Sequence, residues 1–205
     1  MKKWNFAYIP EISNEKLMNY FENNLNLNSD QIEALSIGVT VILFNVFEMF
    51  LVLFLSYFLG VLKESILFCI MFIPLRMFAA GIHCKSGHAC IITTLIFYLG
   101  SSLLSKYCPL QNTLIFFIST VCIILLLKYA PADTENRPIL GKECRNKLKI
   151  KTISVAILIL FINITLGNNT TLNCSMYALI IEAISVMPLT YKLFGASYNN
   201  YKLYE

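Results

Sequence analysis

Charged residues are scarce in this chain of 205 residues, since Asp, Glu, Lys and Arg make up only 14% of it. An ordinary soluble domain has about 25% charged and about 45–50% apolar residues. Here the hydrophobic share is 57% and the mean hydropathy is +0.66. This composition argues against a soluble globular enzyme, a disordered regulator and a fibrous protein. It predicts a polytopic membrane protein in which residues 1–205 form a single membrane-embedded domain.

The chain also lacks the marks of a secreted protein. The two lysines near its N-terminus are not followed by an apolar core, so we expect no cleavable signal peptide. The seven cysteines are odd in number and mostly lie in apolar runs, as at Cys69, Cys122 and Cys174. A disulfide framework is therefore not expected. The net charge of +4 is small, and its distribution favours membrane topology over binding to nucleic acid.

Six apolar segments predict an all-α fold. They cover about residues 34–59, 65–80, 89–104, 114–127, 153–166 and 175–189. Because a helix needs about 20 residues to cross the hydrocarbon core, the second and third segments could instead form a re-entrant pair beside four full spans. Residues 1–30 carry apolar side chains at roughly helical spacing, which predicts an amphipathic helix on the membrane surface or, equally, a loosely packed arm.

Lysine and arginine fall almost entirely on one side of this predicted topology. With a cytoplasmic N-terminus, fourteen of the sixteen lie in cytoplasmic segments and only Lys63 and Lys106 lie outside. The positive-inside rule therefore predicts a multi-pass membrane protein with both termini in the cytoplasm. It also places two polar loops there, at residues 76–90 and 128–151.

The first of these loops holds both histidines of the chain. Four chemically competent side chains lie within eight residues of one another: His83, Cys84, His88 and Cys90. A cysteine nucleophile needs a base or a cation close by, because the thiolate is the reactive form. Contact between His83 and Cys90 requires a break in the helix, which Gly87 can supply. Cys90 would then lie at the start of the third segment, where the helix dipole favours a thiolate.

Two alternatives use the same side chains. Cys84 and His88 are four residues apart, so they could pair on an unbroken helix. All four side chains of the cluster are also competent ligands for zinc or copper, which would make the loop a metal site.

Two motifs of the chain resemble those of the accessory gene regulator protein B (AgrB) family, which are bacterial membrane peptidases of quorum sensing. The first is RMFAAGIHCKSGHAC, from Arg76 to Cys90, and the second is YAPADTENRP, from Tyr129 to Pro138. The length and the six apolar segments agree with the family over essentially the whole chain. The resemblance implies a cysteine endopeptidase of the bacterial cell membrane.

By this resemblance the substrate is a signalling propeptide of the AgrD type, from which the C-terminal part is cleaved. An acyl-enzyme thioester then promotes cyclisation to a thiolactone or a lactone. The catalytic pair is His83 and Cys90, and Arg76, Gly81 and Lys85 match supporting positions of the motif. The resemblance also implies a homodimer in the lipid bilayer, without a cofactor or a resident metal.

The second loop, residues 128–151, is rich in charge. Its basic side chains can be topological charges at the cytoplasmic face, a docking surface for an acidic peptide, or both. The candidates for substrate binding are Asp133, Glu135, Arg137, Lys147, Lys149 and Lys151.

Two carboxylates, Glu48 and Glu182, lie inside apolar segments. A carboxylate there is costly and is a functional candidate, unless it is neutral or turned toward a neighbouring helix. These residues leave open a second function, a small transporter that uses the buried carboxylates. A third is a membrane protein that senses metal or redox state through the His/Cys cluster.

Overall fold

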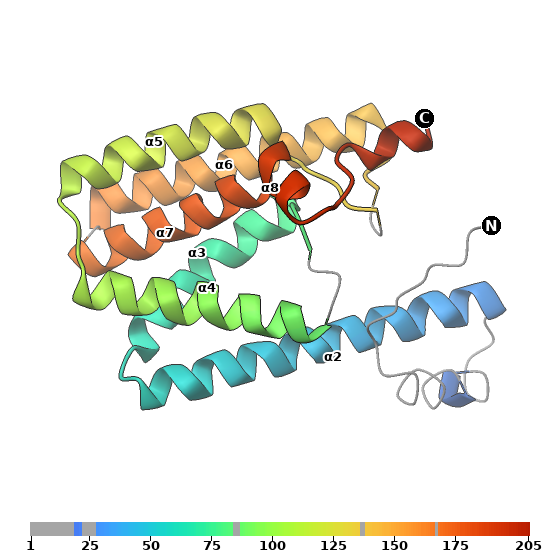
Figure 1. Ribbon diagram of the computed structural model, residues 1–205, viewed down its shortest axis with the longest axis horizontal. Helices are drawn as coiled ribbons and strands as arrows, with labels where there is room; N and C mark the ends of the chain where they lie inside the picture. Colours follow the sequence, from blue (N-terminus) through green and yellow to red (C-terminus); the bar gives the residue numbers. More distant parts are fainter. Residues whose placement is uncertain (1–18, 22–27, 84–86, 136–137, 167) are drawn as a thin grey trace.

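The computed structural model describes residues 19–21, 28–83, 87–135, 138–166 and 168–205, and these form a bundle of helices (Figure 1). The long helices are α2 (Ser29–Phe58), α3 (Leu62–Ala79), α4 (Gly87–Tyr107), α5 (Asn112–Tyr129), α6 (Lys142–Leu166) and α7 (Asn169–Ser185). Two short elements follow, α8 (Pro188–Leu193) and the 3-10 helix η1 (Asn200–Leu203). Within the described ranges no strand forms, so the all-α prediction is confirmed.

The first five predicted apolar segments each correspond to one helix, from α2 to α6. The sixth, at 175–189, covers most of α7 and reaches the start of α8. Most helices extend past the apolar run, and α6 does so by the largest margin. It begins at Lys142 instead of near residue 153, because the intervening Lys, Arg and Glu residues are good helix formers. The predicted loop at 128–151 is therefore wrong in its second half, which is helical. The amphipathic helix predicted within residues 1–30 lies mostly outside the described residues. In the part of this range before α2, residues 19–21 are described and are helical.

Four of the helices, α2, α4, α5 and α6, are long and apolar enough to cross a membrane. The sequence left open six full spans or four spans beside a re-entrant pair made of the second and third segments. The doubt was right for the second segment, α3, but wrong for the third, which became α4 with 21 residues and extends the predicted run by two residues at its start and three at its end. The sixth segment, α7, has 17 residues and joins α3 outside the set of four.

The helices α3 and α7 form the centre of the bundle. α3 and α7 pack against each other, and between them they contact α2, α4, α5 and α6. Fully buried small residues on α7, Ala178 and Ala183, let its neighbours approach closely. Phe68 and Phe72 of α3 stack on each other, and both meet the ring of Tyr98 on α4 edge to face. Buried polar residues of these two helices, such as Ser65 on α3 and Glu182 on α7, are thus shielded by the surrounding helices.

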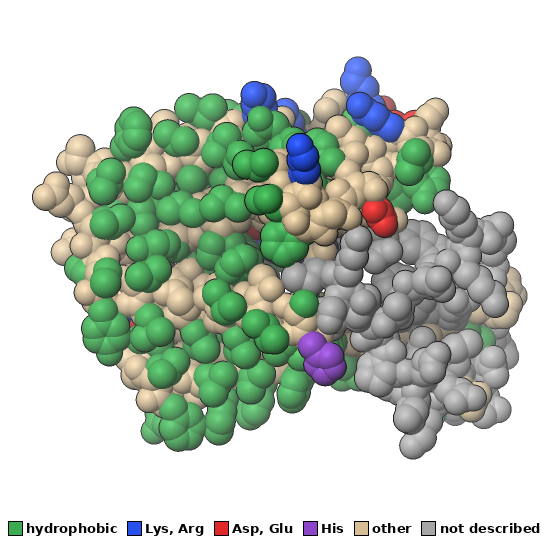
Figure 2. Space-filling view, in the orientation of Figure 1, with side chains coloured by type: hydrophobic (Ala, Val, Ile, Leu, Met, Phe, Trp, Pro, Cys, Tyr) green, Lys and Arg blue, Asp and Glu red, His purple; other side chains and the backbone are tan. Residues whose placement is uncertain are grey.

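The outer surface is largely apolar. Hydrophobic side chains cover most of the face seen in Figure 2, whereas lysines and arginines gather over the end of the bundle near α8 and the C-terminal segment. α2 packs on α3 and α4, and its N-terminal half projects beyond the start of α4 (Figure 1). This distribution is compatible with a protein embedded in lipid with one polar end.

Candidate active site

The predicted catalytic histidine lies on a non-helical segment at the polar end of the bundle. α3 ends at Ala79, and residues 80–83, here called the histidine segment, begin with a positive φ of 60° at Ala80 and lead to an exposed His83. Gly81 has a φ of 95°, a conformation that favours glycine. A Cβ added to Gly81 would lie 2.6 Å from Nη1 of Arg76 and would also collide with the hydroxyl of Ser185. Close packing therefore explains why glycine occupies this position.

Backbone hydrogen bonds hold the histidine segment between two distant parts of the chain. The N–H of Gly81 donates to the carbonyl of Ala132 at 2.7 Å, and the N–H of Ala132 donates to the carbonyl of Ala79 at 3.0 Å. These bonds form an isolated parallel bridge with the loop that follows α5. On the other side, the N–H of Ile82 donates to the carbonyl of Ser185, at the end of α7, at 3.0 Å.

The guanidinium of Arg76 also holds the histidine segment, through hydrogen bonds to its backbone carbonyls. Its Nη1 donates to the carbonyl of Ala80 at 2.6 Å and to Oγ of Ser185 at 3.0 Å, and its Nη2 donates to the carbonyl of Ile82. The carboxylate of Glu182, which is fully buried, lies 3.7 Å from Nη1. We call these five residues the Arg76 hub. The rigid fork of a guanidinium is suited to this task, because its donors point in several fixed directions.

The Arg76 hub contains two residues that the sequence analysis singled out separately. Arg76 was a supporting position by family resemblance, and Glu182 was a costly carboxylate in an apolar segment. The structure pairs them, so Glu182 is turned toward a neighbouring helix and its charge is balanced by Arg76. No sequence signal linked the two, and none pointed to Ser185.

The predicted nucleophile lies on a different element. α4 begins at Gly87, so the helix break expected at this glycine is present and Cys90 lies in the first turn. The Cys90 side chain is half-buried. The backbone N–H groups of a first turn have no partner within the helix, and the dipole there favours negative charge.

The remaining residues of the first loop are placed only in part. Residues 84–86, which include Cys84 and Lys85, lie outside the described residues, and His88 is exposed on α4. The rival pairing of Cys84 with His88 therefore stays a hypothesis. Among the residues that are described, no three or more His, Cys, Asp or Glu side chains are grouped so that they could hold a metal ion.

The carboxylates of the second loop hold the C-terminal segment of the chain. Asp133, only 3% exposed, accepts hydrogen bonds from the backbone N–H groups of Asn200 at 2.9 Å and Tyr201 at 2.7 Å. Glu135 accepts from the backbone N–H and the hydroxyl of Ser197 at 3.2 and 2.6 Å. The sequence did not predict these contacts with the C-terminal segment, because a charged residue in a loop does not indicate which distant residue it will bind.

A second contact fixes the end of the same segment. Arg145 donates two hydrogen bonds to Glu205, at 2.7 and 2.9 Å, and its guanidinium lies over the ring of Tyr201 at 3.9 Å. The hydrogen bonds from Arg145, together with one from the backbone of Gly141, hold the pKa of Glu205 below its usual value. The C-terminal segment is thus tied to both the second loop and the start of α6.

The predicted basic residues of α6 share the polar end. Lys147 and Lys151 are exposed and lie four residues apart, and Lys149 is half-buried between them. The ammonium of Lys151 lies over the ring of Phe78 on α3, at 5.3 Å from its centre. Positive charge is thereby placed beside the helix that leads into the histidine segment. Arg137 lies outside the described residues.

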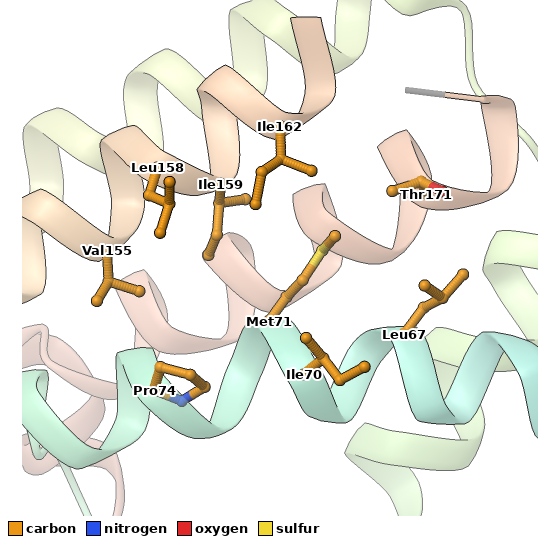
Figure 3. Close-up of a pocket in the computed structure, with 9 residues that line it drawn as sticks. All are labelled: Leu67, Ile70, Met71, Pro74, Val155, Leu158, Ile159, Ile162 and Thr171. Atoms are coloured by element: carbon orange, nitrogen blue, oxygen red, sulfur yellow. The ribbon is translucent and has the colours of Figure 1, made fainter. Parts of the chain in front are cut away.

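A groove elsewhere in the bundle has no comparable chemistry. It lies between α3 and α6 and has a volume of about 420 Å³ (Figure 3). The residues that line it are Leu67, Ile70, Met71, Pro74, Val155, Leu158, Ile159, Ile162 and Thr171. None of them can serve as an acid, a base or a charged ligand, so we place the candidate site at the polar end of the bundle.

A helical bundle in which four of the described helices are long and apolar enough to cross a membrane is compatible with the class of small membrane proteins. Comparison with known proteins identifies the family. The chain belongs to the accessory gene regulator B family, whose model matches residues 14–186. This confirms the resemblance found in the two motifs.

Several relatives support the assignment. An AgrB-like protein of Clostridium acetobutylicum is 30% identical over 182 residues, which cover 89% of this chain and 87% of the relative. An AgrB-like protein of Listeria innocua is 27% identical and covers 82% of each chain. The accessory gene regulator protein B of Staphylococcus aureus is 26% identical over 85% of this chain and 98% of its own. No solved structure matches. The chain has a role in the agr quorum-sensing system, and its family takes part in autoinducer processing.

Proposed function

We propose that the protein is a cysteine endopeptidase that cleaves the C-terminal part of a quorum-sensing propeptide of the AgrD type. In this proposal Cys90 is the nucleophile and His83 is the acid–base group. The observation that supports it is the Arg76 hub, which holds the segment leading to His83 against α3 and α7, together with the position of Cys90 in the first turn of α4. A fixed histidine and a cysteine at a helix start are the parts that thiol catalysis needs.

The chemistry proceeds through a thioester. Sγ of Cys90 forms a bond to the scissile carbonyl carbon while His83 takes the thiol proton. The C–N bond then breaks, and His83 returns the proton to the departing amine. A thiol or hydroxyl of the substrate attacks the thioester, which closes the ring as a thiolactone or a lactone and releases Cys90. Water competes for the same thioester, so an apolar surrounding favours cyclisation.

The supporting residues have structural tasks in this scheme. Arg76 and Gly81 hold the backbone of the histidine segment, and Lys85 belongs to the same motif. A basic docking surface for an acidic part of the propeptide would comprise Arg137, Lys147, Lys149 and Lys151. Asp133 and Glu135 would contribute by holding the C-terminal segment that borders this surface.

We further propose that the protein is a multi-pass protein of the bacterial cell membrane with both termini in the cytoplasm, and that it acts as a homodimer. The topology is supported by the fourteen-to-two division of Lys and Arg and by their position at one end of the bundle (Figure 2). Dimerisation follows from the family resemblance and would bury part of the apolar surface of α2.

The test is a search for the covalent intermediate. A propeptide whose ring-closing Cys or Ser is replaced by Ala cannot cyclise, so the thioester should accumulate. Mass spectrometry should show the protein plus the truncated peptide, and neutral hydroxylamine should release that peptide. Cys84→Ala should form the adduct, whereas Cys90→Ala should not.

Two outcomes contradict the proposal. Cleavage at the normal rate by Cys90→Ala would exclude Cys90 as the nucleophile. Loss of cleavage on addition of a chelator, with Cys90 intact, would indicate a metal-activated water.

A further inference from the structure

The groove between α3 and α6 is apolar along its length and leads to a basic end. Its α6 wall runs from Val155 to Ile162 (Figure 3). Lys151 and Lys147 lie four and eight residues before Val155 on the same helix. Residues four apart lie on the same face of a helix, so both lysines continue the face of α6 that lines the groove.

The basic end joins both walls of the groove. The ammonium of Lys151, from α6, lies 5.3 Å from the centre of the ring of Phe78 on α3. Phe78 follows Pro74, a lining residue, by one helical turn. Neither Lys147 nor Lys151 forms an ion pair with a carboxylate of the described residues. Two exposed positive charges, without a described counter-charge, therefore lie where the apolar groove ends.

The length of this arrangement matches one leaflet of a bilayer. Lys151 and Ile162 are eleven residues apart, which is about 16 Å along the helix. The hydrocarbon core of a bilayer is about 30 Å thick, so one leaflet contributes about 15 Å. With the proposed topology, the two lysines lie at the level of the cytoplasmic headgroups and the groove extends toward the middle of the bilayer.

The cross-section of the groove fits a flexible chain better than a helix. The wall from Val155 to Ile162 is about 10 Å long, so a volume of about 420 Å³ gives a mean cross-section of about 40 Å². A helix about 10 Å across needs about 80 Å². The hydroxyl of Thr171, the one lining side chain with a hydrogen-bonding group, already contacts Asn168 at 2.9 Å. An extended peptide would therefore find no side-chain partner for its backbone, which a hydrocarbon chain does not need.

We propose that the groove and its two lysines form a binding site for an anionic phospholipid, with an acyl chain along the groove and the phosphate at Lys147 and Lys151. Basic pockets between membrane helices on the cytoplasmic side suit anionic headgroups, and each buried CH₂ of the acyl chain adds to the affinity. The inference rests on the proposed topology and is independent of the nucleophile. The headgroup would lie beside the end of α3, where Phe78 follows Arg76 by two residues.

The experiment is native mass spectrometry of the full chain in mild detergent, with phosphatidylglycerol or phosphatidylcholine added. The acyl chains are identical, so the comparison reports on the anionic headgroup. Because one lysine near the headgroup contributes about fivefold in affinity, the wild type should bind phosphatidylglycerol about 25-fold more tightly than phosphatidylcholine. The preference should fall to about fivefold in Lys151→Gln and to about one in Lys147→Gln/Lys151→Gln.

Lys142→Gln/Lys192→Gln is the matched control for charge. It also removes two exposed lysines from the polar end of the bundle. Lys142 lies nine residues before Lys151, on the opposite face of α6, and Lys192 lies on α8. This variant should keep the wild-type preference.

The apolar wall is tested by filling the groove. Ile70→Trp places a larger side chain at an exposed lining position and should weaken the binding of both lipids. Leu158→Trp makes the same test from α6, should the first variant fail to fold. Ile157→Trp is the control, because Ile157 is equally exposed on α6 but does not line the groove, and it should change neither affinity.

Equal affinity of the wild type for the two lipids would overturn the proposal, and so would an unchanged preference in folded Lys147→Gln/Lys151→Gln. Binding of a synthetic propeptide that Ile70→Trp weakens, with lipid binding unaffected, would assign the groove to a peptide and overturn it equally. The lipid assay uses no substrate, so its failure is distinct from failure of the proposed function. Cleavage by Cys90→Ala would remove the nucleophile assignment and leave the lipid preference as measured.

Discussion

Replacement of Arg76 by Lys tests whether the Arg76 hub positions the catalytic histidine. Lysine keeps the positive charge beside Glu182, so the ion pair at 3.7 Å should survive in some form. A single ammonium nitrogen cannot reproduce the two arms that reach the carbonyls of Ala80 and Ile82. The histidine segment should therefore lose part of its attachment to α3 while the bundle stays folded.

The expected size of the effect follows from those contacts. A hydrogen bond that involves a charged group contributes about 1.5–3 kcal/mol. Because about 1.4 kcal/mol corresponds to a tenfold change in rate, a displacement of His83 that costs the transition state as much as one such bond lowers kcat/KM about 10- to 100-fold. The loss should fall mainly on kcat, because the hub positions His83 without touching the substrate.

The assay is cleavage of a synthetic propeptide by purified protein in detergent, with kcat and KM measured separately. Arg145→Lys is the matched control, because it makes the same replacement at the guanidinium that binds Glu205. It should change kcat by less than about threefold, as expected for an exposed ion pair. If well-folded Arg76→Lys cleaves within about twofold of the wild-type rate, the positioning argument is wrong.

Three further predictions use other contacts. Gly81→Ala should lower the rate of cleavage by more than about tenfold, because the added Cβ would collide with the Arg76 hub and displace the histidine segment. Gly38→Ala is the control, since its Cβ would enter open space and should leave the rate of cleavage unchanged. The exposed thiols Cys108 and Cys144 lie at opposite ends of the bundle. A membrane-impermeant thiol reagent on intact cells should therefore label Cys108, and should label Cys144 only after permeabilisation. Labelling of Cys144 in intact cells would contradict the proposed topology. The lowered pKa of Glu205 means that its contact stabilises the fold above the unfolded-state pKa and is lost as pH falls through the folded-state value. The Tm difference between wild type and Glu205→Gln should therefore shrink as pH falls, and a constant difference would contradict this.

The fold was largely predictable because its signals are local. Hydrophobic runs located all six long helices, and Gly87 correctly predicted where α4 begins. The length of α4 was underestimated by five residues because its ends, Gly87, His88 and Ser105 to Tyr107, are polar or carry a charge and so lie outside the apolar run.

The site was predictable only in its parts. Arg76 and Glu182 were each singled out, one by its motif and the other by its burial in an apolar segment. Their pairing could not be inferred, because more than 100 residues separate them and a charge pattern carries no information about distant partners. For the same reason the sequence did not predict the hydrogen bonds between Asp133 and the backbone of residues 200 and 201. Asp133, a candidate for substrate binding, thus holds the C-terminal segment.

Contacts between helices explain how a small bundle could hold the proposed site without a separate catalytic domain. The histidine segment is attached to α3 and α7 by the Arg76 hub, and the start of α4 sets the position of Cys90. A segment held by several hydrogen bonds keeps its geometry better than a free loop, so we expect little reorganisation when the proposed peptide binds. The cost is that charged residues must be buried in apolar helices, where each needs a partner. Arg76 and Glu182 meet that need as a pair, so changing either residue should affect the histidine segment through the other.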